Sequence, residues 1–438
     1  MQFVSTRDAQ HRVGFSEALS RGLATDGGLY VPMDWPAVAV QSAGQSTMAD
    51  ESLSSRAAVF LAPFAADDPL AMQMPAIAAE TFNFPAPLVP LDADRLGVLE
   101  LFHGPTAAFK DFGARFLAAV LTRLRRGAKN PLKILVATSG DTGGAVAAAF
   151  HRQPGIEVVV LFPMGKVSPT QQQQLTCWGD NVQSLAVRGS FDDCQRLVKQ
   201  AFVDPAMSQR WELSSANSIN LGRLLPQAVY YVATSLAVRA RTGGPASFVI
   251  PSGNLGNATA CVWARRLGAP IAEILLAHNA NRTVPDYLND GVLRTRPSVA
   301  TLASAMDVGN PSNLERLSAL YPDAAALGIG LSAVSIDDEA IRSRIRADYQ
   351  RYGVIWCPHT ATAAEAWAEL EPAHRRRGSW VLVATAHPAK FREIVEPLIG
   401  RPVPVPASLE RLFKRPARFD EIDPTLRSLC TALEGHST

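Results

Sequence analysis

Short apolar runs, rich in β-branched residues, recur along the middle of the chain, and most end at Gly, Ser or Asn ahead of a helix-like stretch. Five of them are LKILVA, IEVVVLFP, SFVIP, IAEILL and SWVLVA, which begin at residues 132, 156, 247, 271 and 379. The runs are nearly continuous rather than alternating, which is typical of strands with both faces buried. Strand, glycine-rich turn and helix in repetition predict a parallel sheet covered by helices, and hence an α/β fold.

The two ends of the chain lack this alternation. The first 90 residues are rich in alanine and proline, so we expect residues 1–90 to form a separate N-terminal domain. A proline-rich run, RPVPVPASLERLFKRP, starts at Arg401 and marks the edge of a C-terminal tail, residues 401–438. The length of 438 residues corresponds to about three domains of ordinary size.

Composition and charge restrict the class of protein. Apolar residues make up 47% of the chain and charged residues 19%, as in soluble globular proteins. A net charge of +2 offers no electrostatic basis for nucleic acid as the main partner. The N-terminus, MQFVSTRDAQ, lacks the layout of a signal peptide, and no apolar run approaches the ~20 residues that span a bilayer. We therefore expect a cytoplasmic protein without a membrane partner.

Cysteine and histidine give no sign of a metal site. The five cysteines are widely spread without a CxxC, and the eight histidines show no paired ligand spacing. This usage fits a reducing compartment and argues against a disulfide framework. We predict no metal ion.

One lysine stands out by its surroundings. In HGPTAAFKDFG, residues 103–113, Lys110 lies between two phenylalanines. Apolar residues then recur every four positions from Phe112 to Leu124, which predicts an amphipathic helix, with Asp111 as its N-cap candidate. Burial at such a helix start lowers the pKa of a lysine and makes its neutral, nucleophilic form available. The alternative is an ordinary surface lysine at a helix start.

Three segments are rich in small hydrogen-bond donors. They are TSGDTGG at 138–144, SSANSINLGR at 214–223 and SGNLGN at 252–257. The first and last lie between a predicted strand and a predicted helix, where open α/β sheets bind ligands and helix N-termini favour anions. Arg223 could hold a phosphate or carboxylate with its planar fork, and Lys166 is a weaker candidate. The alternatives are plain turns, a helix cap and a surface arginine; neither nucleotide-binding fingerprint is present.

Together these segments resemble those of the threonine synthase family. Its members are pyridoxal-phosphate enzymes with the tryptophan-synthase-β-like fold, which is also called fold type II. The similarity is greatest to the bacterial and fungal branch with an extra N-terminal domain. The matching stretches are DGGLYVP, LFHGPTAAFKDFG, ATSGDTG, SSANSIN, PSGNLGN, AMDVGNPSN and TAHPAKF, in the family's order between residues 26 and 391.

The resemblance implies two three-layer α/β/α domains besides the N-terminal one. The larger would comprise residues 91–130 and 224–400 and bind pyridoxal phosphate, and the smaller would comprise residues 131–223. It further implies that Lys110 forms the internal aldimine with the cofactor. The residues that would surround the cofactor are Asp141, Gly253, Asn254, Leu255, Gly256, Asn257 and Thr385, with Thr385 near the pyridine nitrogen. Phenylalanine is common in the family at Leu255 and aspartate at Asn257, but backbone donors survive both changes.

The resemblance also implies a substrate, O-phospho-L-homoserine, which γ-elimination and β-hydration convert to L-threonine and phosphate, the last step of threonine biosynthesis. Its carboxylate would bind at the loop that contains Ser139, Gly140 and Thr142. Its phosphate would bind Asn217, Ser218 and Arg223, with help from Lys166, although Met164 replaces an arginine often seen in the family. The resembled branch is often monomeric, so we expect a monomer. Alternatives are a serine/threonine dehydratase-like enzyme, a non-catalytic relative that binds phosphorylated ligands, and a nucleotide-binding protein such as a kinase.

Overall fold

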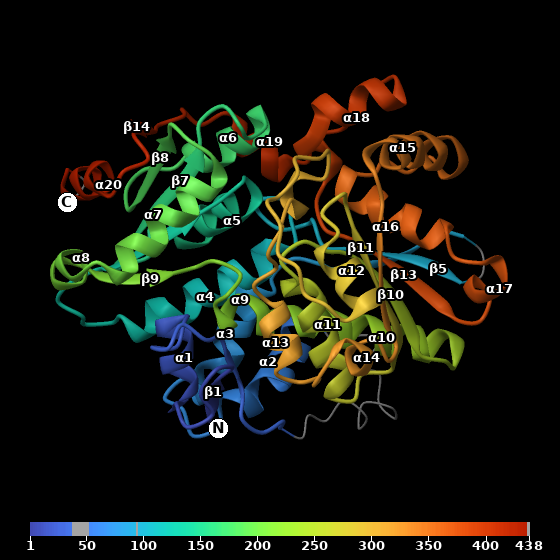
Figure 1. The fold of residues 1–438 in the computed structure, drawn as a ribbon, viewed down its shortest axis with the longest axis horizontal. Helices are drawn as coiled ribbons and strands as arrows, with labels where there is room; N and C mark the ends of the chain where they lie inside the picture. The colour runs from blue at the N-terminus through green and yellow to red at the C-terminus, as the bar shows by residue number, and fades with distance from the viewer. Residues whose placement is uncertain (37–51, 93–94, 436–438) are drawn as a thin grey trace.

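Two separate parallel sheets organise the computed structural model, which describes residues 1–36, 52–92 and 95–435 (Figure 1). The larger has the strand order β12-β11-β10-β13-β5-β4, and all neighbours are parallel except β4 and β5. Its strands are β4 (Leu88–Pro90), β5 (Leu96–Glu100), β10 (Ala246–Pro251), β11 (Ile271–His278), β12 (Leu331–Ser335) and β13 (Ser379–Ala384).

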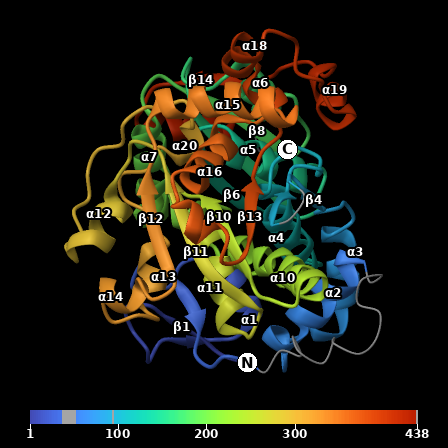
Figure 2. The same cartoon turned by 90° about the vertical axis from the view of Figure 1, so that its right-hand side faces the viewer.

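Helices cover both faces of the six-stranded sheet (Figure 2). Alternate side chains of β10 point to opposite faces: Phe248 joins a core with α10 (Ala228–Thr242) and α11 (Gly256–Arg266), and Val249 joins a core with α15 (Asp338–Tyr352) and α16 (Pro358–Ala368). Burial on both faces is the reason that the strand sequences are continuously apolar.

The second sheet has five parallel strands in the order β14-β8-β7-β6-β9. They are β6 (Leu132–Ala137), β7 (Ile156–Pro163), β8 (Val182–Val187), β9 (Glu212–Ser215) and β14 (Asp420–Ile422). Its helices include α4 (Lys110–Leu124), α5 (Asp141–Phe150), α6 (Pro169–Thr176), α7 (Phe191–Val203), α8 (Pro205–Arg210) and α20 (Leu426–Glu434). Strand β14 and helix α20 come from the predicted C-terminal tail, so this segment completes a sheet and covers α7.

The N-terminal region forms a small antiparallel sheet in the order β2-β1-β3, which sequence reasoning missed because its strands are only two or three residues long. The sheet comprises β1 (Phe3–Ser5), β2 (Arg12–Val13) and β3 (Tyr30–Pro32), and the helices are α1 (Phe15–Arg21), α2 (Leu53–Leu61) and α3 (Met74–Thr81). These helices pack on α4 and α10, and their apolar side chains share one continuous core with them.

The remaining elements are short and lie in the connections between the strands and the longer helices. The helices are α9 (Leu221–Leu224), α12 (Thr283–Asp290), α13 (Leu314–Ser318), α14 (Ala324–Leu327), α17 (Pro372–Arg375), α18 (Arg392–Ile399) and α19 (Ala407–Phe413). The 3-10 turns are η2 (Ala62–Ala65), η3 (Ala71–Gln73), η4 (Leu225–Gln227), η5 (Ser304–Met306) and η6 (Pro388–Phe391). In the part of the chain that the structure describes, every helix is too short or too polar to span a bilayer.

The predicted α/β class and the five predicted strands are confirmed.

The N-cap prediction for Asp111 is wrong. Helix α4 begins at Lys110, with Phe109 as its N-cap. The buried carboxylate of Asp111 instead accepts hydrogen bonds from the Thr106 backbone N–H at 2.9 Å and from the Thr106 hydroxyl at 2.6 Å. Asp111 therefore fixes the turn that precedes the helix. The domain boundaries expected from the sequence stay predictions.

Candidate active site

A cavity of about 380 Å³ lies where the carboxyl ends of strands from both large sheets meet. Strand β10 ends at its wall with Pro251, strand β13 leads into it at Thr385, and strand β6 leads into it at Thr138. This is the edge at which parallel α/β sheets bind ligands. A volume of this size suits a small molecule.

Lys110 lines this cavity at the start of α4. The turn before it is tied to the segment after β13: the Phe109 N–H donates to the Thr385 carbonyl at 2.9 Å, and the His387 N–H donates to the Ala107 carbonyl at 3.0 Å. The Lys110 Nζ lies 4.8 Å from the centre of the Phe109 ring and makes no hydrogen bond with the described residues. Burial lowers its pKa to about 8, although the Asp141 charge opposes this shift. The structure therefore supports a shielded, reactive amine over a surface lysine.

Asp141, the first residue of α5, lies beside this amine and is only 4% exposed. Its Oδ1 is 3.0 Å from the Nζ of Lys390 and accepts a hydrogen bond from Gln171 at 3.2 Å. Burial on its own raises the pKa of Asp141, but the charges of Lys390 and Lys110 hold it well below its usual range. Sequence reasoning missed Lys390, although it lies inside the quoted TAHPAKF stretch.

The SGNLGN segment connects β10 to α11 and curves around one end of the cavity. Gly253 approaches Met306 so closely that a Cβ at this position would lie 2.7 Å from the Met306 Cα. Leu255 adopts a left-handed φ of 60° and precedes α11 without a side-chain cap. The first N–H groups of α11 thus have no intrahelical acceptor and favour an anion.

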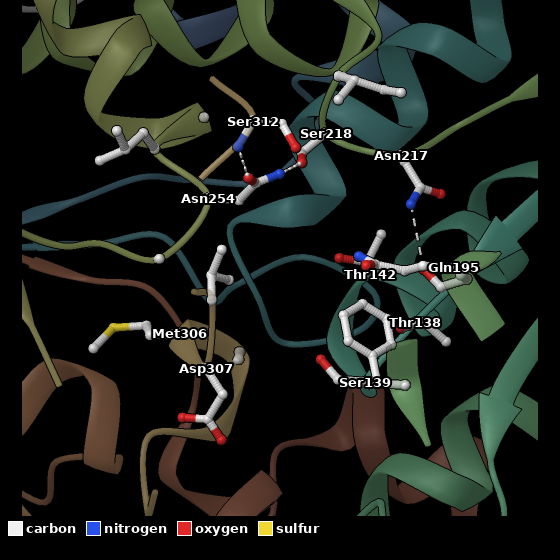
Figure 3. Close-up of a pocket in the computed structure, with 18 of the residues that line it drawn as sticks. Thr138, Ser139, Thr142, Gln195, Asn217, Ser218, Asn254, Met306, Asp307 and Ser312 are labelled. Carbon is white, nitrogen blue, oxygen red and sulfur yellow. Dashed lines mark hydrogen bonds between the residues drawn. The ribbon is translucent and has the colours of Figure 1, made fainter. Parts of the chain in front are cut away.

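Two asparagines hold this segment in place. Asn254 donates to the Ser218 hydroxyl at 2.6 Å and accepts from the Ser312 N–H at 2.6 Å (Figure 3). The Oδ1 of Asn257 accepts from the hydroxyls of Tyr230 and Tyr231, whereas its buried Nδ2 finds no partner among the described residues. An orphaned donor at this point is a further feature suited to an anion.

The predicted substrate residues fall into two groups. Those that line the cavity are Ser139, Thr142, Asn217, Ser218 and Arg223. Figure 3 shows Ser139, Thr142 and Asn217 on one side and Ser218 beside Asn254 on the other. Gly140 lies just behind the lining; its φ is 137°, and a Cβ there would lie 2.5 Å from the Gln171 side chain. Lys166 is exposed in the β7–α6 connection and is not brought to the cavity.

Arg223 is buried on the short helix α9. Its guanidinium donates to the Ala216 carbonyl, while its Nε has no partner in the described part of the chain. Burial lowers its pKa to about 10. An arginine buried with spare donors and no carboxylate bonded to it can bind an anionic group in the cavity.

Several lining residues were not predicted. Lys199 and Gln195 come from α7, Arg296 and Asp307 come from the segment between α12 and α13, and His359 comes from α16. Burial lowers the pKa of His359 to about 4, and its Nε2 accepts from the Ala305 N–H at 3.1 Å, so it acts as a neutral anchor for that segment. Asp307 lies in the quoted AMDVGNPSN stretch, but nothing in the sequence indicated that α7 lies across the cavity.

The residues present fit pyridoxal phosphate. Lys110 offers an amine for its aldehyde, and the α11 terminus with the Asn257 amide offers donors for its phosphate. The Thr385 hydroxyl, 6% exposed and without a hydrogen-bond partner among the described residues, is available to the ring nitrogen. No group of three or more side chains among the described residues is arranged to hold a metal ion.

Comparison with known proteins agrees with this fit. Residues 80–386 match the family described as "Pyridoxal-phosphate dependent enzyme", which sets the class of the protein and its cofactor. Residues 2–82 match "Threonine synthase N terminus", and residues 360–431 match "Threonine synthase, C-terminal". The chain belongs to the threonine synthase family.

Individual relatives agree over nearly the whole length. The chain is 38% identical to threonine synthase of Escherichia coli over 93% of this chain and 94% of the relative. The crystal structure of the Escherichia coli enzyme matches with a TM-score of 0.90 at 36% identity, covering 100% of both chains. The structure of pyridoxal-phosphate-bound threonine synthase from Brucella melitensis matches with a TM-score of 0.89 at 34% identity, covering 100% of this chain and 99% of the other. The predicted fold type II is thereby confirmed.

Proposed function

We propose that this protein converts O-phospho-L-homoserine and water to L-threonine and phosphate. One observation carries the proposal beyond family membership: a lysine that makes no hydrogen bond with the described residues lies in a cavity bordered by two sets of anion-binding donors. One set lies at the α11 terminus, and the other comprises Asn217, Ser218 and Arg223. The cofactor and the substrate each carry one phosphate, so two sites are needed.

Pyridoxal phosphate, when bound, supplies an electron sink for a carbanion at the substrate α-carbon. Lys110 would hold its aldehyde, and the α11 terminus would hold its phosphate. The Thr385 hydroxyl would hydrogen bond to the ring nitrogen; a neutral partner does not keep that nitrogen protonated. Asp141 lies at the same wall, beside Lys110.

Lys110 is the base for the substrate α-proton. A pKa of about 8 leaves an appreciable neutral fraction of this amine near neutral pH. Ser139, Gly140 and Thr142 precede or open α5, where backbone N–H groups favour the substrate carboxylate. Asn217, Ser218 and Arg223 hold the phosphate that leaves the γ-carbon. Lys166 could assist only after a movement of its connection towards the cavity.

A product assay tests the proposal. The purified, cofactor-loaded protein is incubated with O-phospho-L-homoserine, and phosphate and threonine are quantified together. Equal amounts of the two support the synthase reaction. Phosphate together with a 2-oxo acid would indicate elimination without hydration, as in a dehydratase. Neither product, from protein that retains its visible absorption, would contradict the substrate and favour a non-catalytic ligand-binding relative.

The proposal extends to the setting of the enzyme. We infer a monomer in the cytoplasm that acts on a small molecule, as expected from the sequence. Sedimentation velocity of the loaded protein measures the first point, and a dimer at micromolar concentration would contradict it.

A further inference from the structure

Lys390 is a fully buried cation close to the cavity, with 0% exposure. It lies in η6, after strand β13. Its Nζ donates to the Thr106 carbonyl at 2.9 Å and lies 3.0 Å from the Asp141 Oδ1. Thr106 belongs to the turn that carries Lys110, and Asp141 opens α5. One ammonium therefore joins three segments of the active site without itself lining the cavity.

The ion pair between Lys390 and Asp141 decides which of two neighbouring lysines the Asp141 carboxylate binds. Asp141 is buried between two lysines, yet among the described residues its ion pair is with Lys390 and not with Lys110. A buried carboxylate that paired with Lys110 would hold that amine in its charged form. A buried carboxylate with no partner would be costly. Lys390 compensates the Asp141 charge without lining the cavity. Asp141 is therefore not left unpaired, and it does not need to pair with Lys110.

Other titratable groups that face Lys110 do not take this role. Arg223 on α9 is a cation that lowers the pKa of Lys110, but no ion pair joins it to Asp141 among the described residues. Cys357, the N-cap of α16, and His359 within that helix are neutral, since burial raises the pKa of the thiol and lowers that of the imidazole to about 4. Asp111 already accepts two hydrogen bonds from Thr106. Lys390 is the cation that an ion pair joins to Asp141 in the described part of the chain.

We propose that Lys390 is a positioning residue that binds Asp141 and so keeps the Lys110 amine available to the cofactor and the substrate. The inference rests on the proposed function only in that Lys110 is taken as the reactive amine. It does not depend on the identity of the substrate.

The test compares Lys390→Met, Asp141→Asn and the double variant with the parent protein. The measured quantity is the rate at which each apoprotein takes up pyridoxal phosphate, followed by visible absorption across pH 6 to 10. The midpoint of this profile reports the pKa of Lys110. No phosphorylated substrate is present, so failure of the product assay and failure of this test are separate results.

Opposite shifts are expected from the single variants. Lys390→Met removes a cation and leaves Asp141 to act on Lys110, so the midpoint moves up by about one pH unit or more. Asp141→Asn removes a carboxylate and moves the midpoint down. The double variant removes both charges, and its midpoint returns to within about half a unit of the parent.

Lys133→Met is the matched control. Lys133 is a buried lysine of β6 that pairs with Glu157, and it does not line the cavity. Its profile should equal that of the parent. If Lys390→Met fails to fold, Asp141→Asn and the double variant still provide the comparison. An unchanged midpoint in folded Lys390→Met, or an upward shift that persists in the double variant, would overturn the proposal.

Discussion

Replacement of Arg316 by methionine tests how the N-terminal region supports the active site. Arg316 is 0% exposed on α13, and its guanidinium donates to three acceptors from separate segments. These are the Tyr30 carbonyl of β3 at 3.1 Å, the Ile219 carbonyl at 2.6 Å and the Asn313 Oδ1 at 2.6 Å. Asn313 in turn donates to the Asn254 carbonyl at 2.9 Å. The network links the N-terminal sheet to both predicted anion sites.

The expected loss of stability follows from the three acceptors. Methionine fills most of the arginine stem but donates no hydrogen bond. Each buried acceptor left without a partner costs about 1–3 kcal/mol, and relaxation or entry of water reduces the sum. We expect the free energy of unfolding to fall by about 3–5 kcal/mol, within the range for disruption of a buried charged network.

Urea denaturation followed by tryptophan fluorescence measures this difference. Arg265→Met serves as control, because among the described residues the half-buried Arg265 makes a single, solvent-exposed hydrogen bond, to the Gly330 carbonyl. Its expected cost is below about 1 kcal/mol. The Arg316 variant should also bind both phosphate groups more weakly, since the Asn254 and Ile219 segments lose a shared anchor. A loss of less than about 1 kcal/mol in Arg316→Met, or the same loss in both variants, would refute the reasoning.

Three further predictions concern the cavity itself. The rate of pyridoxal phosphate uptake by the parent apoprotein should rise about fivefold between pH 7 and pH 8 and level off above pH 9, because the neutral amine of Lys110, with a pKa of about 8, is the reacting form; a rise that continues to pH 10 would mean an ordinary lysine. Arg223→Ala should raise the KM for O-phospho-L-homoserine at least tenfold and change the Kd for pyridoxal phosphate less than about threefold; equal losses in titrations of both ligands would contradict its role. Gly253→Ala should weaken pyridoxal phosphate binding about tenfold, because the new Cβ would lie 2.7 Å from the Met306 backbone. Gly244→Ala is the control and should leave the Kd unchanged, because a Cβ there has nothing within 4 Å.

Local signals in the sequence were sufficient for the α/β class and for strands β6, β7, β10, β11 and β13, whereas β4, β5, β8, β9, β12 and β14 were not predicted. The continuous apolar runs correspond to strands with both faces buried, and the glycine-rich turns correspond to the connections from strand to helix. The short strands of the N-terminal sheet gave no such signal, because two or three residues show no periodicity. The Asp111 prediction failed for a related reason: a side chain that suits an N-cap can instead bond backward to Thr106, and the sequence does not distinguish the two.

The candidate site was predictable only where a motif carried its own chemistry. Lys110 between phenylalanines and the SGNLGN turn each indicated a role, and the structure brings both to one cavity. The α7 residues Gln195 and Lys199 could not be predicted, since their helix forms part of the cavity wall only after the two sheets pack together. Lys166 has the right charge for an anion site, but the fold leaves it in solvent.

The sequence by itself determined the α/β class, five of its strands with the glycine-rich turns that follow them, and the presence of a lysine suited to pyridoxal phosphate. Periodicity, turn residues and short motifs act over a few neighbouring positions, so they can be read from the chain. Tertiary structure alone decided that Lys390 pairs with Asp141 and that Arg316 joins Tyr30 to the Asn254 segment. Lys390 and Asp141 lie more than two hundred residues apart along the chain, and so do Arg316 and Tyr30. The burial of these side chains and the distances between them arise only when the two sheets and the N-terminal region share one core.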